Sequence, residues 1–453
     1  MSILERLEKQ KTSQPESNEK KKVGREVASR NAQDDNYVLL KQRVHSEMIE
    51  AVNKEKRDDF ASDAEKREYY REKLEAIVNA GNAQLNRAER NRLIEEVYDD
   101  VVGLGPLEPL LQDPEITEIM VNNYDLVYIE THGKIKLSGV KFRDNTHVMN
   151  VINRIVSTVG RHIDEANPMV DARLSDGSRV NAVISPVALS GPTVTIRKFS
   201  KNPLTVSDLV KFGSVSPKMV NFLEACVRGR KNIVVSGGTG SGKTTLLGIL
   251  SDYIPDDERI VTIEDAAELQ LRQQHVITME SRPANIEGTG QITIRDLVRN
   301  ALRMRPDRIV VGEVRSGETL DMLQAMNTGH DGSLTTAHAN SPRDLISRME
   351  TMVLMSGIEM PVRAIREQIA SAVDIIVHQA RMRDGSRKIV SITEVVGMEG
   401  DIITLQDIYT YQLDGIDSVG RQKGHFVATG TRPTFSDDLS AMGIMVKDSW
   451  FQN

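Results

Sequence analysis

A glycine-rich loop between a strand-like run and a helix-like run limits the fold that this chain can adopt. The loop spans residues 236–245, SGGTGSGKTT, and contains the pattern G-x-x-x-x-G-K-[ST]. The apolar run Ile233-Val234-Val235 precedes it, and a helix-like stretch follows up to Leu250. Strand, loop and helix in this order are the context in which such a loop binds the phosphates of a nucleotide. The sequence therefore predicts a parallel α/β sheet with a nucleotide at one edge.

The residue types in this loop suit phosphate binding. Glycines let backbone N–H groups approach phosphate oxygens because no Cβ intervenes, and the start of a helix adds partial positive charge. Lys243 is predicted to reach the β- and γ-phosphates and Thr244 to bind Mg²⁺. The alternative, a glycine-rich turn with a surface lysine, is disfavoured by the flanking runs. The loop residues predicted to bind ATP are Gly238, Thr239, Gly240, Ser241, Gly242, Lys243, Thr244 and Thr245.

The length of 453 residues predicts two or three domains, and the first hundred residues are polar or helical in pattern. Residues 1–36 are predicted to be a disordered tail, because they are charged and have little to bury. A short docking helix with Ile3, Leu4 and Leu7 on one face is the alternative for this tail. Residues 37–102 predict a small bundle of three helices, with Asn86 as a possible N-cap. The bundle is either a spacer or a docking module for a partner.

The remainder of the chain predicts two larger units. Residues 103–200 contain short strand-like runs and one amphipathic helix, which is typical of an α+β domain. Residues 201–218 contain two prolines and a glycine and are predicted to be a linker. From residue 219 to the end, 219–453, strand-like and helix-like segments alternate before a C-terminal extension of short strands. We therefore expect an α/β nucleotide-binding domain after an α+β domain.

Charge, cysteine content and hydropathy exclude several classes of protein. The net charge of −7 gives no indication of nucleic-acid binding. Cys226 is the only cysteine, so an intrachain disulfide is impossible and a reducing cytoplasm is expected. No apolar run approaches the ~18 residues of a transmembrane segment. The N-terminus lacks the apolar segment of a signal peptide. Work at a membrane is therefore expected to go through a membrane-bound partner.

Two strand-like runs after the loop end in carboxylates. The first is residues 260–265, which end in Glu264 and Asp265, and the second is residues 309–313, which end in Glu313. Because ligands in an open α/β sheet bind beyond the carboxyl ends of strands, both glutamates should lie at the edge that carries the loop. Glu264 and Glu313 are candidates to orient the attacking water or to hold Mg²⁺ through water. The alternative is that each is an ordinary strand cap.

Several arginines are candidates for stabilising charge on a transferred phosphate. Arg295, Arg299 and Arg303 recur every four residues on one helix face, and Arg305 follows just before a proline. Arg303 and Arg305 are predicted to reach a phosphate in their own subunit or a neighbouring one. The alternative is a solvated face that forms ion pairs.

Two histidines and three arginines complete the predicted site residues. His330 and His338 flank a strand-like run, and their spacing is not a recurring zinc pattern. Both are candidates to sense the γ-phosphate or to relay between subunits, although a lone histidine is more often structural. In the first domain, three arginines are predicted to contact nucleotide when the domains close, or otherwise to be surface charges: Arg173, Arg179 and Arg197.

The order of these motifs resembles the type II/IV secretion ATPase family, and within it the CpaF-like ATPases of tight-adherence (Flp) pilus assembly. The resemblance covers roughly residues 100–410. It rests on a Walker A loop, an acidic box, a Walker B region and a histidine box, which are Gly237–Thr245, Thr262–Glu268, Ala301–Arg315 and Thr328–Asn340. Gly312 stands where an aspartate is usual before the Walker B glutamate, and Ser316 where glycine is commoner.

This resemblance implies a RecA-like ATPase domain and a homo-hexameric ring with ATP between the two domains of a subunit. It assigns phosphate and Mg²⁺ binding to Lys243 and Thr244, and catalysis to Glu264 and Glu313. Hydrolysis would act on an inner-membrane pilus platform protein. The chain is therefore predicted to be a cytoplasmic Mg²⁺-dependent ATPase, peripheral to the inner membrane through its partners.

Three other functions remain open from the sequence. The nearest is a motor for another type II/IV system that secretes protein or DNA. A more distant one is a scaffold that binds ATP but scarcely hydrolyses it. A small-molecule kinase is the third, although no substrate pocket is visible in the sequence and the large N-terminal domain favours a mechanical role.

Overall fold

The computed structural model of the protein describes residues 36–37, 39–52, 54–55, 60, 62–81, 85–199, 203–284, 288–416 and 422–452. The predictions of a disordered tail and of a docking helix around Ile3 lie outside these residues. The chain divides into two compact units. The first comprises Met1–Glu130, Ile135–Leu174 and Val180–Lys198; the second comprises Thr131–Lys134, Ser175–Arg179 and Phe199–Asn453.

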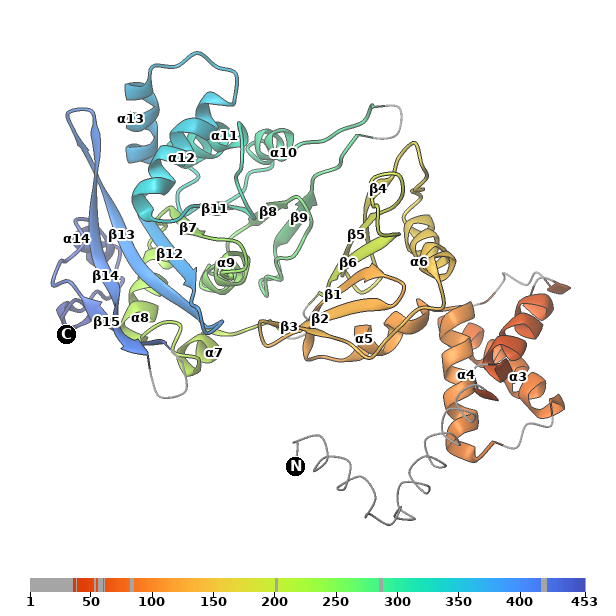
Figure 1. Ribbon diagram of the computed structural model, residues 1–453. Coiled ribbons are helices and arrows are strands. Elements are labelled where there is room, and N and C mark those ends of the chain that lie inside the picture. Colours follow the sequence, from red (N-terminus) through yellow and green to blue (C-terminus); the bar gives the residue numbers. More distant parts are fainter. Residues whose placement is uncertain are drawn as a thin grey trace, which may run out of the picture. The chain divides into compact units, whose positions relative to one another are not determined.

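The first unit begins with helices that share an apolar core. Residues 39–52 are helical, and α3 (Asp63–Ala80) and α4 (Arg87–Val101) follow (Figure 1). Asn86 caps α4 as predicted: its Oδ1 accepts a hydrogen bond from the Glu89 N–H at 2.9 Å, and Glu89 bonds back to the Asn86 N–H. The core of these helices contains Val44, Met48, Tyr70, Leu74, Val78, Leu93, Ile94 and Val97.

A six-stranded sheet follows the helices in the same unit. After η1 (Gly105–Leu107) and α5 (Glu108–Gln112), its strands run in the order β3-β2-β1-β6-β5-β4. One amphipathic helix, α6 (Asn145–Thr158), buries the residues predicted to face inward, Val148, Val151, Ile152 and Ile155. The strands are β1 (Ile116–Asn123), β2 (Leu126–Thr131), β3 (Lys134–Leu137), β4 (Met169–Arg173), β5 (Arg179–Val183) and β6 (Thr193–Arg197).

Buried polar contacts join the helices to this sheet, so the two predicted domains form one unit. Lys41 Nζ lies 3.3 Å from a carboxylate oxygen of Asp100 on α4. His147 on α6 approaches the other oxygen of Asp100 at 3.6 Å. Arg154, also on α6, donates to the Asp100 carbonyl at 3.3 Å. Since Asp100 and His147 are both buried, these contacts hold α4 against α6.

The segment predicted as a linker contains a helix. A capping box between Thr205 and Asp208 starts α7 (Val206–Lys211). Leu209 and Val215 are buried in the core of the second unit. The proline and glycine signals in 201–218 therefore mark turns beside a short helix, and the described part of this segment belongs to the packed domain.

The second unit is built on a nine-stranded sheet in the order β15-β14-β13-β12-β7-β11-β10-β8-β9. The strands from β9 to β12 pair in parallel, and those from β12 to β15 pair antiparallel. The strands are β7 (Ile233–Gly237), β8 (Ile260–Glu264), β9 (Val276–Glu280), β10 (Arg308–Val311), β11 (Leu334–His338), β12 (Ile375–Arg381), β13 (Arg387–Glu399), β14 (Ile402–Ile416) and β15 (Gln422–Ala428).

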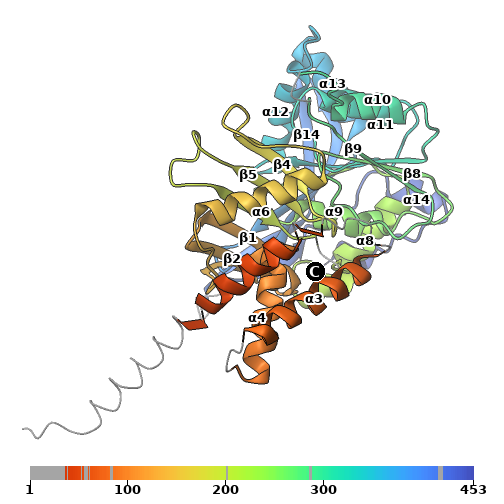
Figure 2. The same cartoon turned by 90° about the vertical axis from the view of Figure 1, so that its right-hand side faces the viewer.

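Helices cover both faces of this sheet, as Figure 1 and Figure 2 show. Alternate residues of β7 enter two cores: Ile233 and Val235 face one, and Val234 faces the other. The first core takes side chains from α8 (Pro217–Arg228), α9 (Lys243–Ser251) and α14 (Ser436–Ala441). The second takes them from α10 (Ile294–Ala301), α11 (Glu318–Asn327), α12 (Pro342–Leu354) and α13 (Val362–Ala372).

This arrangement confirms the expected α/β fold. The chain ends near η2 (Asp448–Trp450), whose neighbour Phe451 is buried in the first core. Within the described residues, no helix combines the length and apolar character needed to cross a membrane.

Candidate nucleotide site

The glycine-rich loop has the predicted strand–loop–helix geometry. β7 ends at Gly237 and α9 begins at Lys243. Gly240 and Gly242 have φ values of +70° and +94°, in the left-handed region that favours glycine. Ser241 closes the loop, since its hydroxyl donates to the Gly238 carbonyl at 2.9 Å. The loop is therefore shaped as the motif predicts.

Lys243 lies folded back over this loop. Its Nζ donates to the Gly238 carbonyl at 3.1 Å, and both ring nitrogens of His338 lie 3.4 Å from Nζ. The residue is buried, with 8% of its surface exposed. A buried ammonium held by a loop carbonyl and an imidazole is positioned to move onto the oxygen of an entering phosphate.

The parallel register places the other predicted acids and His338 at the same edge of the sheet. His338, the last residue of β11, pairs with Gly237 at the end of β7. Val311 at the end of β10 pairs with Ile263 of β8, so Glu313 and Glu264 follow at similar heights. The expected edge is therefore the one that the structure shows, while the catalytic roles of these residues stay predictions.

Glu313 connects His338 with Arg315, for which the sequence predicts no role. One carboxylate oxygen lies 3.0 Å from His338 Nε2, and the other accepts a hydrogen bond from Arg315 at 2.7 Å. We call Lys243, His338, Glu313 and Arg315 the charged cluster. Within this cluster, the Lys243 ammonium contacts the His338 ring, and the ring contacts the Glu313 carboxylate. The carboxylate in turn pairs with the Arg315 guanidinium. Arg315 stands two residues after Glu313. This short spacing from the acidic strand end is the sequence feature that could have indicated the pair.

His338 is held in its neutral form within the charged cluster. Burial is the main cause that lowers the pKa of His338 below the ordinary value of 6.5, with Lys243 and Arg315 acting in the same direction and Glu313 opposing them. A neutral imidazole has one donor and one acceptor nitrogen. Both ring nitrogens lie 3.4 Å from Lys243 Nζ, so the acceptor nitrogen of either neutral tautomer is within reach of the ammonium.

Glu264 is committed to the backbone that follows its strand. Only 3% of the residue is exposed, and its carboxylate accepts hydrogen bonds from the N–H groups of Glu268 at 3.1 Å and Leu269 at 3.2 Å. A Cβ at Gly312 would lie 2.7 Å from Glu264 Cγ. The expected aspartate at Gly312 therefore has no room beside Glu264. These contacts favour Glu313 over Glu264 as the acid that faces the phosphates.

The other predicted helix arginines and His330 lie elsewhere. Arg295 and Arg299 on α10 pair with Asp321 at 2.8 and 2.7 Å. Ion pairs on this helix face were the alternative to contact with a phosphate. Arg303 and Arg305 are exposed and precede β10, so they lie at the amino edge of the sheet. His330 likewise precedes β11, a strand of 5 residues that spans about 16 Å.

These positions separate Arg303, Arg305 and His330 from the loop of their own chain. Their predicted action on a phosphate then requires a neighbouring subunit, and it stays a prediction. Arg173 ends β4 and Arg179 begins β5. Arg197 ends β6 and pairs with Glu118 at 3.0 Å. That these three reach nucleotide likewise stays a prediction.

The protein groups fit a Mg²⁺ ion only together with a nucleotide. Across the described ranges, no group of three or more His, Cys, Asp or Glu side chains is placed to hold a metal. Mg²⁺ in nucleotide sites usually takes one or two protein ligands, with phosphate oxygens and waters supplying the rest. Thr244, in the first turn of α9, and the Glu313 carboxylate suit that share.

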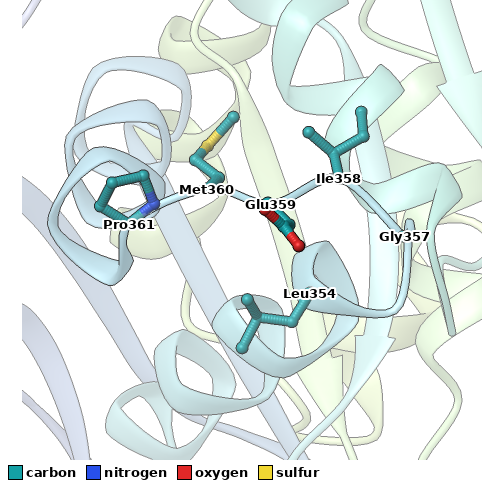
Figure 3. Close-up of a pocket in the computed structure, with 6 residues that line it drawn as sticks. All are labelled: Leu354, Gly357, Ile358, Glu359, Met360 and Pro361. Carbon is teal, nitrogen blue, oxygen red and sulfur yellow. The ribbon is translucent and has the colours of Figure 1, made fainter.

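A separate pocket lies at the connection between α12 and α13 (Figure 3). α12 has 13 residues, about 20 Å, and starts just after β11, so this pocket lies far from the loop. Its walls are mainly apolar with one carboxylate, which does not suit phosphate. The lining residues are Leu354, Gly357, Ile358, Glu359, Met360 and Pro361.

Comparison with known proteins identifies the family of this chain. The family described as "Type II/IV secretion system protein" matches residues 100–418, which is most of the chain. The chain belongs to this family. The matched residues of this type II/IV secretion system protein contain the whole charged cluster and the glycine-rich loop.

Individual relatives come from several secretion and transfer systems. A putative conjugal transfer protein of Mycobacterium tuberculosis is 38% identical over 309 residues, 67% of this chain and 87% of that protein. The type IV secretion system protein VirB11 of Brucella suis is 34% identical over 302 residues, 61% of this chain and 84% of that protein. The crystal structure of the Brucella suis VirB11 ATPase, at 31% identity, covers 63% of this chain and 94% of that one, with a TM-score of 0.35.

Proposed function

We propose that this protein is an Mg²⁺-dependent ATPase that powers assembly of a tight-adherence pilus. The observation that carries the proposal is the position of Lys243, buried in a phosphate-binding loop and in contact with His338 of the charged cluster. Family membership supports a secretion or pilus machine as the target of the work. The protein would act at the inner membrane, from the cytoplasm, as a homo-hexamer on platform proteins.

Phosphate binding follows from the loop itself. Its backbone N–H groups and the start of α9 supply a positive cradle for the β- and γ-phosphates of ATP. Lys243 exchanges the Gly238 carbonyl for a phosphate oxygen, which is a stronger, charge-assisted hydrogen bond. Thr244 and Glu313 would hold Mg²⁺, directly or through water, and the ion would offset the negative charge of the phosphates.

Hydrolysis requires a water molecule that is held in line with the γ-phosphate. Glu313 is the acid placed for this task, because Glu264 already binds two backbone N–H groups. Arg315 holds one oxygen of Glu313 in place, and His338 contacts the other. When Lys243 moves onto a phosphate oxygen, His338 loses its contact with Lys243. The interaction of the imidazole with Glu313 then depends on whether phosphate occupies the loop.

A substitution of Lys243 tests the enzymatic part of the proposal. Lys243→Ala should reduce ATP turnover at least about 100-fold, since it removes a buried charge aimed at the developing phosphate charge. Lys211→Ala, which removes an exposed lysine at the end of α7, is the matched control and should retain wild-type turnover. Phosphate release by the full chain is the measurement. Wild-type turnover in Lys243→Ala would refute the assignment of the site.

A second candidate function is a motor for conjugal transfer or another type IV secretion system. It is favoured by the 38% identity to a putative conjugal transfer protein. Deleting the gene separates the two functions, because a pilus motor is required for surface pili and a transfer motor for DNA donation. Loss of pili with normal DNA transfer supports the first function, and the opposite result supports the second.

A further inference from the structure

The hairpin of β12 and β13 lies directly against the glycine-rich loop. β12 runs parallel to β7 and pairs Gln379 with Gly237. The approach is so close that a Cβ at Gly237 would lie 2.1 Å from the Gln379 carbonyl oxygen. The first glycine of the motif is therefore required by the hairpin as well as by phosphate.

The hairpin changes its register at this point. Its pairing shifts between His378 and Gln379, so a bulge lies beside the start of the loop. Bulges re-aim the side chains that follow, and they are common next to active sites. Beyond this shift, Arg381 and Arg387 stand directly opposite one another across the two strands.

Both arginines lie beside the glycine-rich loop, and Arg381 also donates a hydrogen bond to the Gly133 carbonyl. Arg387 Nε donates a hydrogen bond to the Gly240 carbonyl at 3.0 Å. A Cβ at Gly242 would lie 3.2 Å from Arg387 Cδ, and one at Gly240 would lie 3.4 Å from a guanidinium nitrogen of Arg381. Gly237, Gly240 and Gly242 are therefore all in close contact with the same hairpin.

Hydrogen bonds in and beside its turn hold this hairpin in place. Asp384 in the turn accepts hydrogen bonds from Ser386, from N–H at 2.9 Å and from hydroxyl at 2.7 Å. Lys388 Nζ donates to the Gly213 carbonyl at 2.6 Å.

Like charges directly opposite in an antiparallel pair are destabilising. An anion bound at the adjacent loop would offset the repulsion between Arg381 and Arg387.

We propose that the β12–β13 hairpin is a second wall of the nucleotide site and that Arg387 is a positioning residue for the loop. By holding the Gly240 carbonyl on its side of the loop, Arg387 keeps the neighbouring N–H groups turned toward the phosphates. Its charge adds to that of Lys243. This inference rests on the proposed nucleotide binding at the loop, and it adds a residue about 140 positions downstream of the motif.

Nucleotide affinity of matched variants tests this inference. Arg387→Ala in the full chain should weaken binding of the fluorescent nucleotide mant-ADP about tenfold, or about 1.4 kcal/mol, with kcat reduced less than KM is raised. Arg383→Ala is the control, because Arg383 lies in the same turn with an exposed side chain and its removal costs the same charge. It should bind mant-ADP like wild type, at an unchanged melting temperature.

Each outcome decides the inference. Equal affinity of Arg387→Ala and Arg383→Ala would overturn it. If Arg387→Ala unfolds, Arg387→Lys decides: about threefold weaker binding supports the inference, since an ammonium cannot reproduce the guanidinium geometry, and wild-type affinity overturns it. Lys243→Ala separates this from the proposed function. Wild-type mant-ADP binding by Lys243→Ala would refute nucleotide binding at the loop, whereas its loss beside a wild-type Arg387→Ala refutes the hairpin alone.

Discussion

The two edges of the nine-stranded sheet carry similar residues in opposite arrangements. At the carboxyl edge, Lys243, His338 and Glu313 surround a glycine-rich loop whose backbone can accept a ligand. At the amino edge, Arg308 at the start of β10 has no exposed side-chain surface and pairs with Glu258 at 2.5 Å. The first arrangement leaves charges beside a binding loop, and the second satisfies them within the fold.

Other polar groups at the amino edge also have hydrogen-bond partners within the fold. Arg308 also donates to the Gly332 carbonyl at 3.1 Å. Asp374 accepts from the Asn232 N–H at 2.8 Å, and the Asn232 side chain accepts from the Ser333 N–H at 2.9 Å. A buried charge with a full set of partners stabilises one arrangement of the strands. The comparison predicts that substitutions at the amino edge change stability and those at the carboxyl edge change chemistry.

The largest expected effect on stability is that of Arg308→Met. It leaves Glu258 without its main partner and should lower the free energy of unfolding by about 3–5 kcal/mol. Urea denaturation measures the change, and exposed Arg305→Met is the matched control, expected within about 0.5 kcal/mol of wild type. The double variant with Glu258→Gln should recover part of the loss. A stability equal to that of the control would contradict the contrast between the edges.

Glu313→Gln should have the largest effect on turnover among the acids. Removal of the carboxylate that we propose to orient water should lower kcat about 100- to 1,000-fold while nucleotide still binds. Phosphate release and mant-ADP affinity, measured on the same protein, separate these effects. Asp331→Asn, a neutralised and exposed acid before β11, is the control. Unchanged turnover in Glu313→Gln would shift the catalytic role to Glu264.

Some of this site follows from the sequence and some does not. The loop and the strand-ending acids were predictable, because parallel strands bring their carboxyl ends to one edge. The same rule distinguishes His338, at the end of β11, from His330, which precedes the strand, once the strand limits are known. Arg387 was not predictable, since only tertiary pairing of β12 with β7 brings it to Gly240.

The fold shows the same division. The α/β alternation and the Asn86 cap were readable from local patterns. The union of helices and sheet in the first unit was not, because it depends on the contacts of Asp100 with His147 and Arg154, which lie far from it in the sequence, and these polar residue types do not predict burial. The helix in the predicted linker was hidden by flanking proline and glycine signals.

Gly312→Ala tests why the usual aspartate is missing beside Glu264. The added methyl would lie 2.7 Å from Glu264 Cγ, so it should cost about 1–3 kcal/mol of stability through overpacking. Gly329→Ala is a poor control because its φ is +93°; Gly139→Ala, which meets nothing within 4 Å, is the matched one. Thermal unfolding compares them. Equal melting temperatures would mean that Glu264 moves freely away from Gly312.

The smallest expected effect is a pH dependence from His338. Its pKa in the folded protein is lowered from 6.5. A lowered folded-state pKa means that its contribution to stability is present above pH 6.5 and is lost as the pH falls through the folded pKa. Protonation also places a positive charge on the ring beside Lys243 and Arg315, so turnover should fall on the acid side of pH 6.5. His338→Gln should flatten that acid limb; an unchanged pH profile would assign it to another group.

The central claim is that nucleotide binds at the carboxyl edge through Lys243, independently of the stabilising charges at the amino edge. The direct measurement is the melting temperature of the full chain with and without ATP and Mg²⁺, because a ligand at 100 times its Kd stabilises the folded state by about 2.7 kcal/mol. The wild type and Arg308→Met should both shift upward, the latter from a lower starting temperature, and Lys243→Ala should not shift. An equal ATP-dependent shift in Lys243→Ala, or none in the wild type, would contradict the claim.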